Sequence, residues 1–309
     1  MMNILKFFTM NQADVNEYFR LRREELYNRK GPRATHIRFH NFMHYGLIYA
    51  LKAVRILEKR KVVVLEDKRE NKGNRPTIYA CSHVGGKDIE SLFEAIRNPC
   101  YLFLGDSGPY YRSIDGLMLW LNGIIALETR NKTDRAIAKE RAISLLKQGG
   151  SLMMFPEGAW NITENEPMMK MYSGAAAMAL ESGADIVPVA LEKYDDTYYA
   201  IIGEELRHSD FAEKNAKTLT AELRDILSTL KWNIWEHFGV FPRNEQSREE
   251  FYKHLYSLFD LVDGYTYQDV VETRFYDKNI TSQKDAFSHL GEITPTKQTA
   301  FLFKNNLKG

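Results

Sequence analysis

A histidine and an aspartate stand five residues apart in the segment ACSHVGGKDIESLFEAI, residues 80–96. His83 ends a run of small and apolar residues. Asp88 lies where a helix is predicted to begin, because the apolar residues that follow it recur at i, i+3, i+4 and i+7. Gly85 and Gly86 would let the chain fold back so that the carboxylate reaches the imidazole. A carboxylate bound to one ring nitrogen leaves the other nitrogen as a proton acceptor, which is what a general base requires. The alternative is a strand-end histidine next to a helix-capping aspartate.

A second carboxylate, Glu157, follows an apolar run in the segment SLMMFPEG. Pro156 would stiffen the exit from this strand, and Gly158 would allow close approach of the backbone. Open α/β sheets bind ligands at the carboxyl edge of their strands. Because His83 ends a strand too, we expect His83, Asp88 and Glu157 to share one cleft.

Seven strand-like runs alternate with helical patterns along the middle of the chain. Continuous apolar strands separated by helices are typical of an α/β domain whose sheet is covered on both faces. The predicted strands are KVVVLED from residue 61, then 77–82, 100–105, 123–128, 151–155, 185–192 and 197–203.

The first 61 residues are basic, although the whole chain carries a net charge of only +1. They hold 13 basic and 5 acidic residues, which favours a solvated face or a surface for anionic lipid. A helix is predicted at 35–57, with His36, His40 and His44 along one side. We interpret this row as the polar edge of an interfacial helix. The alternative is a transition-metal site, but neither a carboxylate nor a cysteine accompanies the row, so we expect no metal.

Helical patterns return after the last predicted strand. One helix carries the apolar stripe Leu219, Leu223, Ile226 and Leu230, with residues 209–210 as its predicted cap. A second helix is predicted at 248–261. From residue 265 onward the sequence has no strong helix signal and receives no role. We divide the chain into a basic helical segment at 1–61, a central domain at 62–208 and a helical extension with an irregular tail at 209–309.

Composition excludes several classes of protein. The near-neutral charge gives no chain-wide signal for nucleic-acid binding. Cys81 and Cys100 are the only cysteines, so a disulfide framework is not expected and a reducing compartment fits. The longest uncharged runs fall short of the roughly 18–20 residues that span a bilayer, and the first residues show no signal-peptide pattern. We therefore expect a cytoplasmic protein without a transmembrane helix.

Three short motifs resemble those of the glycerolipid acyltransferase family, which includes the lysophospholipid and 1-acylglycerol-3-phosphate acyltransferases. They are SHVGGKD, FPEG and, at 186–189, IVPV, and the resemblance covers about residues 62–206. It implies an α/β fold with a central mixed, largely parallel sheet flanked by helices, here with helical N- and C-terminal extensions. It also implies that His83 deprotonates the acceptor hydroxyl and that Asp88 orients His83. Backbone N–H groups at 84–87 are candidate donors to the oxyanion.

The resemblance extends to the binding of substrates. It implies that Glu157 and Gly158, next to Phe155 and Pro156, face the glycerol side of the acceptor. It places Pro188 in the motif linked to acyl binding, although a proline of a core strand is an equal alternative.

The sequence departs from the family pattern where arginines are expected to bind phosphate. The second motif begins at Gly123 but ends in Thr129, with Arg130 one position late. Ala159 and Trp160 follow FPEG in place of Thr-Arg. Trp160 could cover an apolar or sugar-like acceptor, or simply pack. Four basic residues could still bind a headgroup: Lys87, Arg130, Arg135 and Lys170.

The resemblance thus predicts an O-acyltransferase of phospholipid or glycerolipid synthesis. It would move a fatty acyl group from a coenzyme A or acyl carrier protein thioester to a lysophospholipid or related acceptor, without a metal or bound cofactor. We expect it to act peripherally on the cytoplasmic face of the membrane, docked through the helix at 35–57. The alternative for this helix is that it merely packs on the sheet. The alternatives are a lipid or thioester hydrolase and a non-catalytic lipid-binding protein of the same fold.

Overall fold

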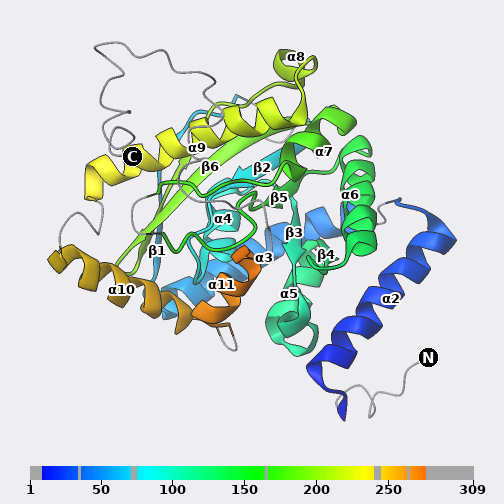
Figure 1. The fold of residues 1–309 in the computed structure, drawn as a ribbon, viewed down its shortest axis with the longest axis horizontal. Helices are drawn as coiled ribbons and strands as arrows, with labels where there is room; N and C mark the ends of the chain where they lie inside the picture. Colours follow the sequence, from blue (N-terminus) through cyan, green and yellow to red (C-terminus); the bar gives the residue numbers. More distant parts are fainter. Residues whose placement is uncertain are drawn as a thin grey trace, which may run out of the picture.

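A seven-stranded sheet forms the centre of the protein (Figure 1). The computed structural model describes residues 9–33, 36–70, 75–163, 166–239, 245–262 and 265–275. The strands lie in the order β1-β7-β6-β2-β5-β3-β4, and all neighbours are parallel except β6 and β7. This confirms the predicted mixed, largely parallel sheet. The strands are β1 (Lys61–Asp67), β2 (Thr77–Cys81), β3 (Tyr101–Gly105), β4 (Ile124–Leu127), β5 (Leu152–Met154), β6 (Asp185–Tyr194) and β7 (Thr197–Ile202).

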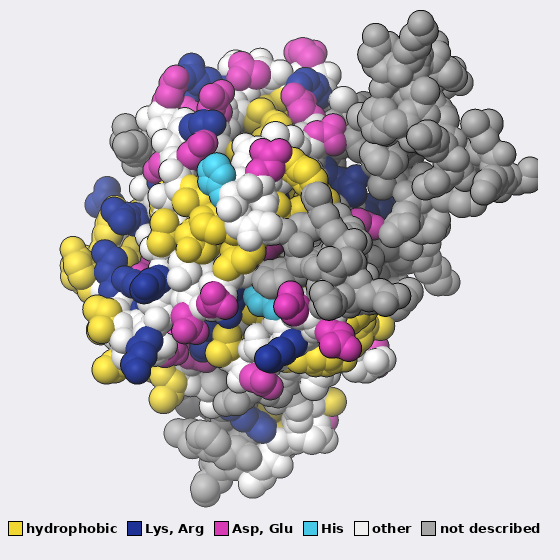
Figure 2. All heavy atoms as spheres, turned by 90° about the vertical axis from the view of Figure 1, so that its left-hand side faces the viewer, with side chains coloured by type: hydrophobic (Ala, Val, Ile, Leu, Met, Phe, Trp, Pro, Cys, Tyr) yellow, Lys and Arg dark blue, Asp and Glu magenta, His cyan; other side chains and the backbone are white. Residues whose placement is uncertain are grey.

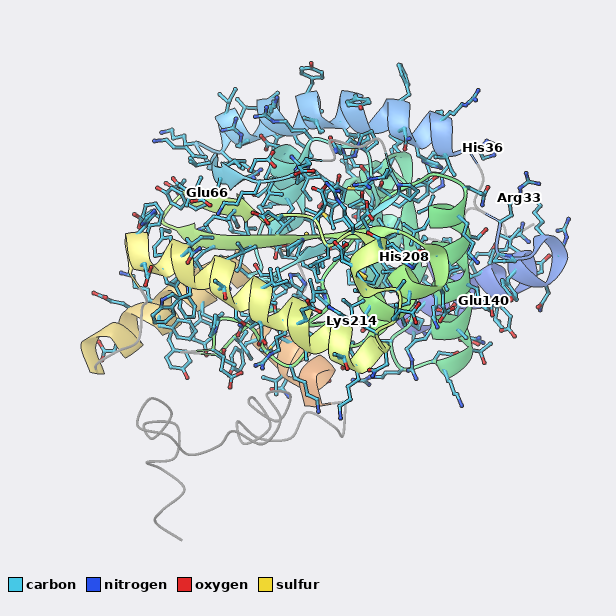
Figure 3. The ribbon with its side chains drawn as sticks, turned by 90° about the horizontal axis from the view of Figure 1, so that it is seen from above. Arg33, His36, Glu66, Glu140, His208 and Lys214 are labelled. Carbon is cyan, nitrogen blue, oxygen red and sulfur yellow. The ribbon has the colours of Figure 1, made fainter. Side chains whose placement is uncertain are left out.

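Helices cover both faces of this sheet. Three of them, α6 (Lys132–Lys147), α7 (Gly174–Ser182) and α9 (Ala216–Phe238), pack on one face, and α4 (Asp88–Ile96) and α5 (Ile114–Asn122) pack on the other. The short helix η1 (Gly108–Arg112) precedes α5. Outside α4 and α5 lies α3 (Ile37–Leu57), which runs along one margin of the molecule when the molecule is seen from above (Figure 3).

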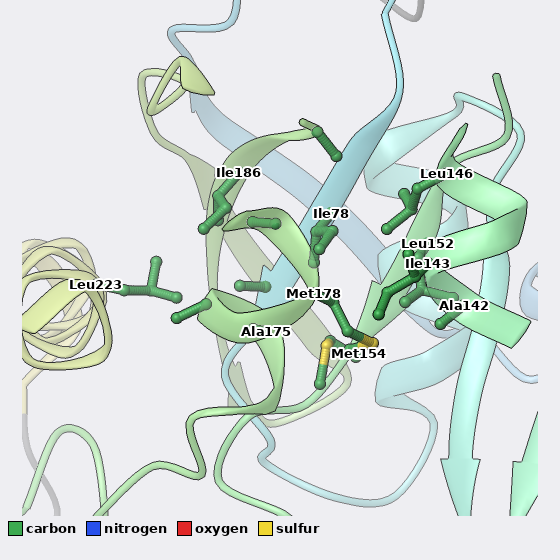
Figure 4. Packing of buried hydrophobic residues seen from close by; sticks show 14 of the residues in the cluster. Ile78, Ala142, Ile143, Leu146, Leu152, Met154, Ala175, Met178, Ile186 and Leu223 are labelled. Carbon is green, nitrogen blue, oxygen red and sulfur yellow. The ribbon is translucent and has the colours of Figure 1, made fainter. Parts of the chain in front are cut away.

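Strand β2 shows why the strands read as continuous apolar runs. Ile78 and Ala80 point into the cluster formed with α6, α7 and α9, which Figure 4 shows from close by. Tyr79 and Cys81 point into the opposite cluster, against α4 and α5. All four residues are completely buried, because helices cover both faces of the sheet and shield the side chains on each face from solvent.

The hairpin between β6 and β7 gives the sheet its single antiparallel pair. Tyr194 pairs with Thr197, so only Asp195 and Asp196 make the turn, with Asp195 at a φ of 48°. Two-residue hairpin turns require positive φ, which aspartate tolerates better than most residues. The tight reversal places β7 next to β6, and β1 then joins β7 in parallel.

The N-terminal helices lie against this body. α2 (Gln12–Lys30) is tied to the start of α6 by an ion pair between Arg23 and Asp134, 2.6 Å apart. The helix predicted at 35–57 is α3, and it packs on α4 and α5. In the described parts of the chain, every helix is too short or too polar to cross a bilayer. The domain boundaries proposed from the sequence stay predictions.

The interpretation of the histidine row as the polar edge of an interfacial helix is wrong for His44. Nδ1 of His40 lies 3.0 Å from the carbonyl oxygen of Leu121, and Nδ1 of His44 lies 2.7 Å from Oδ1 of Asn122. His44 is buried. His40 and His44 therefore face the end of α5, where each imidazole contacts a polar group. Within the described ranges, no group of three or more His, Cys, Asp or Glu could hold a metal ion.

The C-terminal extension is helical, but the predicted cap of its first long helix is wrong. The predicted cap at 209–210 belongs to a separate single turn, α8 (His208–Phe211), which buries Phe211. The long helix α9 starts only at Ala216, where Oδ1 of Asn215 accepts a hydrogen bond from the N–H of Thr218. The second predicted helix is α10 (Glu245–Phe259).

A further helix, α11 (Tyr267–Phe275), lies in the region where no strong helix signal was found in the sequence. The rest of the predicted irregular tail, 276–309, lies outside the described residues.

Candidate active site

The carboxyl end of β2 presents His83 next to the first turn of α4. Nδ1 of His83 lies 2.7 Å from Oδ2 of Asp88. The N–H groups of Val84 and Gly85 donate to the same oxygen, at 3.1 and 2.7 Å. Asp88 is buried, and it is the first residue of α4, where the helix dipole favours a negative charge. The predicted contact between the histidine and the aspartate is therefore present, and the carboxylate also holds the turn.

Two glycines make this turn possible. Gly85 and Gly86 have φ values of 91° and 64°. A Cβ at Gly85 would come within 2.4 Å of the indole ring of Trp160, and one at Gly86 within 2.7 Å of the hydroxyl of Tyr198. Both the backbone conformation and the lack of space therefore demand glycine.

The imidazole of His83 is held from its other sides by aromatic rings. It stacks on Phe155, with ring centroids 3.9 Å apart, and meets Trp160 edge to face at 6.2 Å. The His83 carbonyl accepts a hydrogen bond from the N–H of Asn161. The side chain keeps 14% of its surface exposed, so it is wedged in place but still reachable.

Glu157 lies directly behind His83. Its Oε2 accepts from the N–H of His83 at 3.0 Å, and its Oε1 accepts from the N–H of Met169 at 2.9 Å. Burial raises the pKa of this carboxyl above its ordinary value, while the charge of Lys231 and the two backbone donors oppose that rise. Both oxygens are thus bound to the backbone, and the carboxylate braces His83. Its predicted contact with the glycerol of an acceptor stays a prediction.

Most of the backbone N–H groups at 84–87, the predicted oxyanion donors, already donate hydrogen bonds within the protein. Val84 and Gly85 donate to Asp88, and the N–H of Lys87 donates to the hydroxyl of Tyr198 at 2.9 Å. Among the described residues, only the N–H of Gly86 in this turn donates no hydrogen bond. The expectation is therefore wrong for three of the four groups, because the turn uses its own N–H groups to hold its shape.

The remaining residues of the FPEG motif surround the same strand end. Pro156 accepts a hydrogen bond from the N–H of Tyr172 through its carbonyl oxygen. Gly158 has a φ of 73°, and a Cβ there would come within 2.5 Å of the ring of Tyr172. With Phe155 and Glu157, these residues form one side of the site.

The other predicted residues are spread more widely. Arg130 follows β4 at the same edge of the sheet, is well exposed, and its Nη2 lies 3.9 Å from Oε2 of Glu272 on α11. Thr129 is bound by Asp106 through its N–H and its hydroxyl. Gly123 precedes β4 and so lies at the opposite edge of the sheet.

Pro188 lies inside the sheet, buried in β6 opposite Ala80 of β2. The roles of Arg130, Gly123 and Pro188 in substrate binding stay predictions.

The C-terminal extension covers the site, which sequence reasoning missed. Trp160 is buried against Phe259 and Tyr265, at 4.7 and 5.0 Å between ring centroids, so ordinary packing accounts for it. Leu258 and Leu261 lie against Gly86. One sequence signal could have revealed α11: Thr266 and Asp269 have capping-box spacing, and the Thr266 N–H donates to Oδ2 of Asp269 at 2.7 Å.

Comparison with known proteins finds similarity to acyltransferases. The family model named Acyltransferase matches residues 59–192. Over 126 residues, which are 40% of this chain and 44% of the relative, the sequence is 26% identical to the human 1-acyl-sn-glycerol-3-phosphate acyltransferase alpha. Over 75 residues it is 33% identical to the 1-acyl-sn-glycerol-3-phosphate acyltransferase of Borreliella burgdorferi, covering 24% of this chain and 29% of that protein.

The chain spans less than half the length of these curated relatives. A solved structure is also similar: the 1-acyl-sn-glycerophosphate (LPA) acyltransferase PlsC from Thermotoga maritima, with a TM-score of 0.46 and 16% identity, over 75% of this chain and 86% of that one.

Proposed function

Residues 59–192 belong to the acyltransferase family, and on this premise we propose that the protein moves a fatty acyl group from a thioester to the hydroxyl of a lysophospholipid or related acceptor. The reaction would serve glycerolipid synthesis. The observation that carries the proposal is the contact between His83 and Asp88 at the carboxyl end of β2.

The proposed reaction uses His83 first as base and then as acid. Asp88 fixes the proton on Nδ1, so that Nε2 takes the proton of the acceptor hydroxyl as its oxygen attacks the thioester carbonyl. The C–S bond then breaks, and the departing thiolate takes the proton from the imidazolium. The acyl group passes directly to the acceptor, and no covalent enzyme intermediate forms.

The tetrahedral intermediate carries a negative oxygen that needs a hydrogen-bond donor. The N–H of Gly86 is the group of the turn that has no other acceptor among the described residues, so we assign it this role. A coenzyme A or acyl carrier protein thioester is proposed as the donor. The reaction consumes only this thioester and the acceptor, so the proposal includes no metal and no bound cofactor.

The proposal also includes docking on an anionic membrane, because a lysolipid resides there. On the outer side of α3, Phe42 and Tyr49 are 74% and 73% exposed, and on α5 Ile114 is 75% exposed. Phe39 of α3 and Trp120 of α5 touch, with ring centroids 6.5 Å apart, so the two apolar faces adjoin. At the margin of Figure 2 where α3 lies, hydrophobic side chains alternate with Lys and Arg. Apolar groups between cations favour the surface of an anionic bilayer.

The test is a panel of labelled donors and acceptors with purified protein. Coenzyme A and carrier-protein thioesters are each offered with lysophosphatidic acid, with lysolipids of other headgroups and with monoacylglycerol. Label in a diacyl product is expected. Label released only as free fatty acid would instead identify a hydrolase. Vesicle binding without any product would identify a non-catalytic lipid-binding protein. Both of these results contradict the proposal.

A further inference from the structure

Tyr198 of β7 contacts the turn at residues 84–87, which follows His83 and is called the catalytic turn below. It lies on β7, two strands away from β2 in the sheet order, and beyond the region that the family model matches. Its hydroxyl accepts a hydrogen bond from the N–H of Lys87 at 2.9 Å and donates one to the carbonyl of Gly85 at 3.4 Å. One buried hydroxyl therefore binds the backbone on both sides of Gly86.

The environment of Tyr198 keeps this hydroxyl fixed and neutral. The side chain is completely buried in the cluster that also holds Val84 and Leu92. Burial, and after it the nearby charge of Asp88, raises the pKa of the phenol. The hydroxyl therefore keeps its proton for the Gly85 carbonyl, while its oxygen accepts from Lys87.

The turn is held from three directions at once. Asp88 binds it from inside through the N–H groups of Val84 and Gly85, and Tyr198 binds it from β7. On the remaining side Leu258 and Leu261 of the C-terminal extension would lie 3.3 and 3.1 Å from a Cβ at Gly86. Of these contacts, only those of Asp88 and Tyr198 are hydrogen bonds, so these two set where the N–H of Gly86 points.

We propose that Tyr198 is a positioning residue for acyl transfer: its hydroxyl orients the turn from Gly85 to Lys87, and with it the N–H of Gly86 and the start of α4. This inference rests on the proposed function. The β6–β7 hairpin thereby takes part in the reaction, although no sequence motif predicts a role for it.

The test compares Tyr198→Phe with Tyr79→Phe. Tyr79 is an equally buried tyrosine of the same cluster, and its hydroxyl accepts a hydrogen bond from Asn98, away from the catalytic turn. Each variant loses one buried hydroxyl, so both should lower the melting temperature to a similar extent. Tyr198→Phe should lower kcat by roughly ten- to a hundredfold with little change in KM for the thioester, because a small misplacement of reacting groups costs about that much. Tyr79→Phe should keep the wild-type kcat.

A second readout needs no substrate. Amide hydrogen exchange of the peptide that spans residues 84–88 should be faster in Tyr198→Phe and unchanged in Tyr79→Phe. Unchanged exchange in Tyr198→Phe, or equal loss of kcat in both variants, would overturn the positioning role. Wild-type protein that transfers no acyl group would contradict the proposed function instead, and the exchange result would still decide the role of Tyr198.

Discussion

The carboxylate of Asp88 lies 2.7 Å from Nδ1 of His83, although five positions separate the two residues in the chain. The distance is short because the same carboxylate oxygen also accepts the N–H groups of Val84 and Gly85, which curl the turn around it. The contact that would orient the base is therefore also the contact that shapes the turn. Changes to either partner, or to the glycines between them, should affect the two properties together.

The substitution Asp88→Asn tests the orienting role. An amide can still accept from Gly85, but it no longer carries the charge that stabilises the imidazolium. We expect kcat to fall by about 10²- to 10⁴-fold in steady-state acyl transfer while the circular dichroism spectrum stays that of the wild type. Asp210→Asn, the same change at an exposed position of α8, is the control and should retain full activity. Full activity in Asp88→Asn would show that the carboxylate is not needed to orient His83.

The substitution Gly85→Ala tests the packing of the turn. The new Cβ would meet both a positive φ and the ring of Trp160 at 2.4 Å. Gly183→Ala is the matched control, since Gly183 also has a positive φ, 78°, but has open space around its Cβ position. Denaturant unfolding should show a loss of about 1–2 kcal/mol for Gly183→Ala, from the backbone conformation alone. The loss for Gly85→Ala should be clearly larger, and equal losses would mean that Trp160 moves away at no cost.

The buried carboxyl of Glu157 should make stability depend on pH. Burial raises its pKa in the folded protein above the ordinary value of 4.5. Between that value and the raised one, the folded state binds more protons than the unfolded state, so the free energy of unfolding falls as pH increases. Glu157→Gln removes this titration. The stability of the wild type relative to the variant should therefore decline as pH rises above about 4.5. A difference that does not change with pH, or that increases, would refute the raised pKa.

The apolar surface of α3 should govern binding to vesicles. Replacing both Phe42 and Tyr49 with serine removes two of its most exposed rings. Sedimentation with anionic vesicles should weaken by at least about tenfold, because each large side chain contributes on the order of 1 kcal/mol or more when it leaves water. Binding of the wild type should also weaken as salt is added.

Trp232→Ser is the control for this surface. Trp232 is 41% exposed on α9, on the other side of the sheet, and its loss should leave vesicle binding unchanged. Transfer to a short-chain, water-soluble acceptor should be the same in all three proteins. Undiminished sedimentation of the Phe42 and Tyr49 variant would remove α3 as the docking surface.

The strands and the central contact of the site could be predicted from the sequence. A fully buried strand such as β2 appears as an unbroken apolar run, and the helix after Asp88 has a regular apolar period. Because parallel strands end at a common edge, the pairing of β2 with β5 brings His83 and Glu157 together.

The order of the strands and the cover of the site could not be predicted in this way. Strand order depends on pairings between distant segments, such as β1 with β7, and no local pattern encodes them. Tyr198 reads as an ordinary strand residue, since its role follows only from the place of β7 in the sheet. Glu157 braces the site by accepting hydrogen bonds from the N–H groups of His83 and Met169. Because these donors are backbone groups, the residue types in the sequence do not predict the contacts. The helix α11 has only a weak apolar face, so its capping residues were its one clear signal.

The most direct test of the account is the formation of labelled diacyl product by the wild type and by His83→Ala, under the donor and acceptor pair that the panel identifies. The circular dichroism spectrum of His83→Ala should show that the variant is folded, while its melting temperature should fall because it loses the stacking on Phe155 and the contact with Asp88. We expect product from the wild type and none above background from His83→Ala. Product formed at the wild-type rate by folded His83→Ala would contradict acyl transfer by a histidine base at this site.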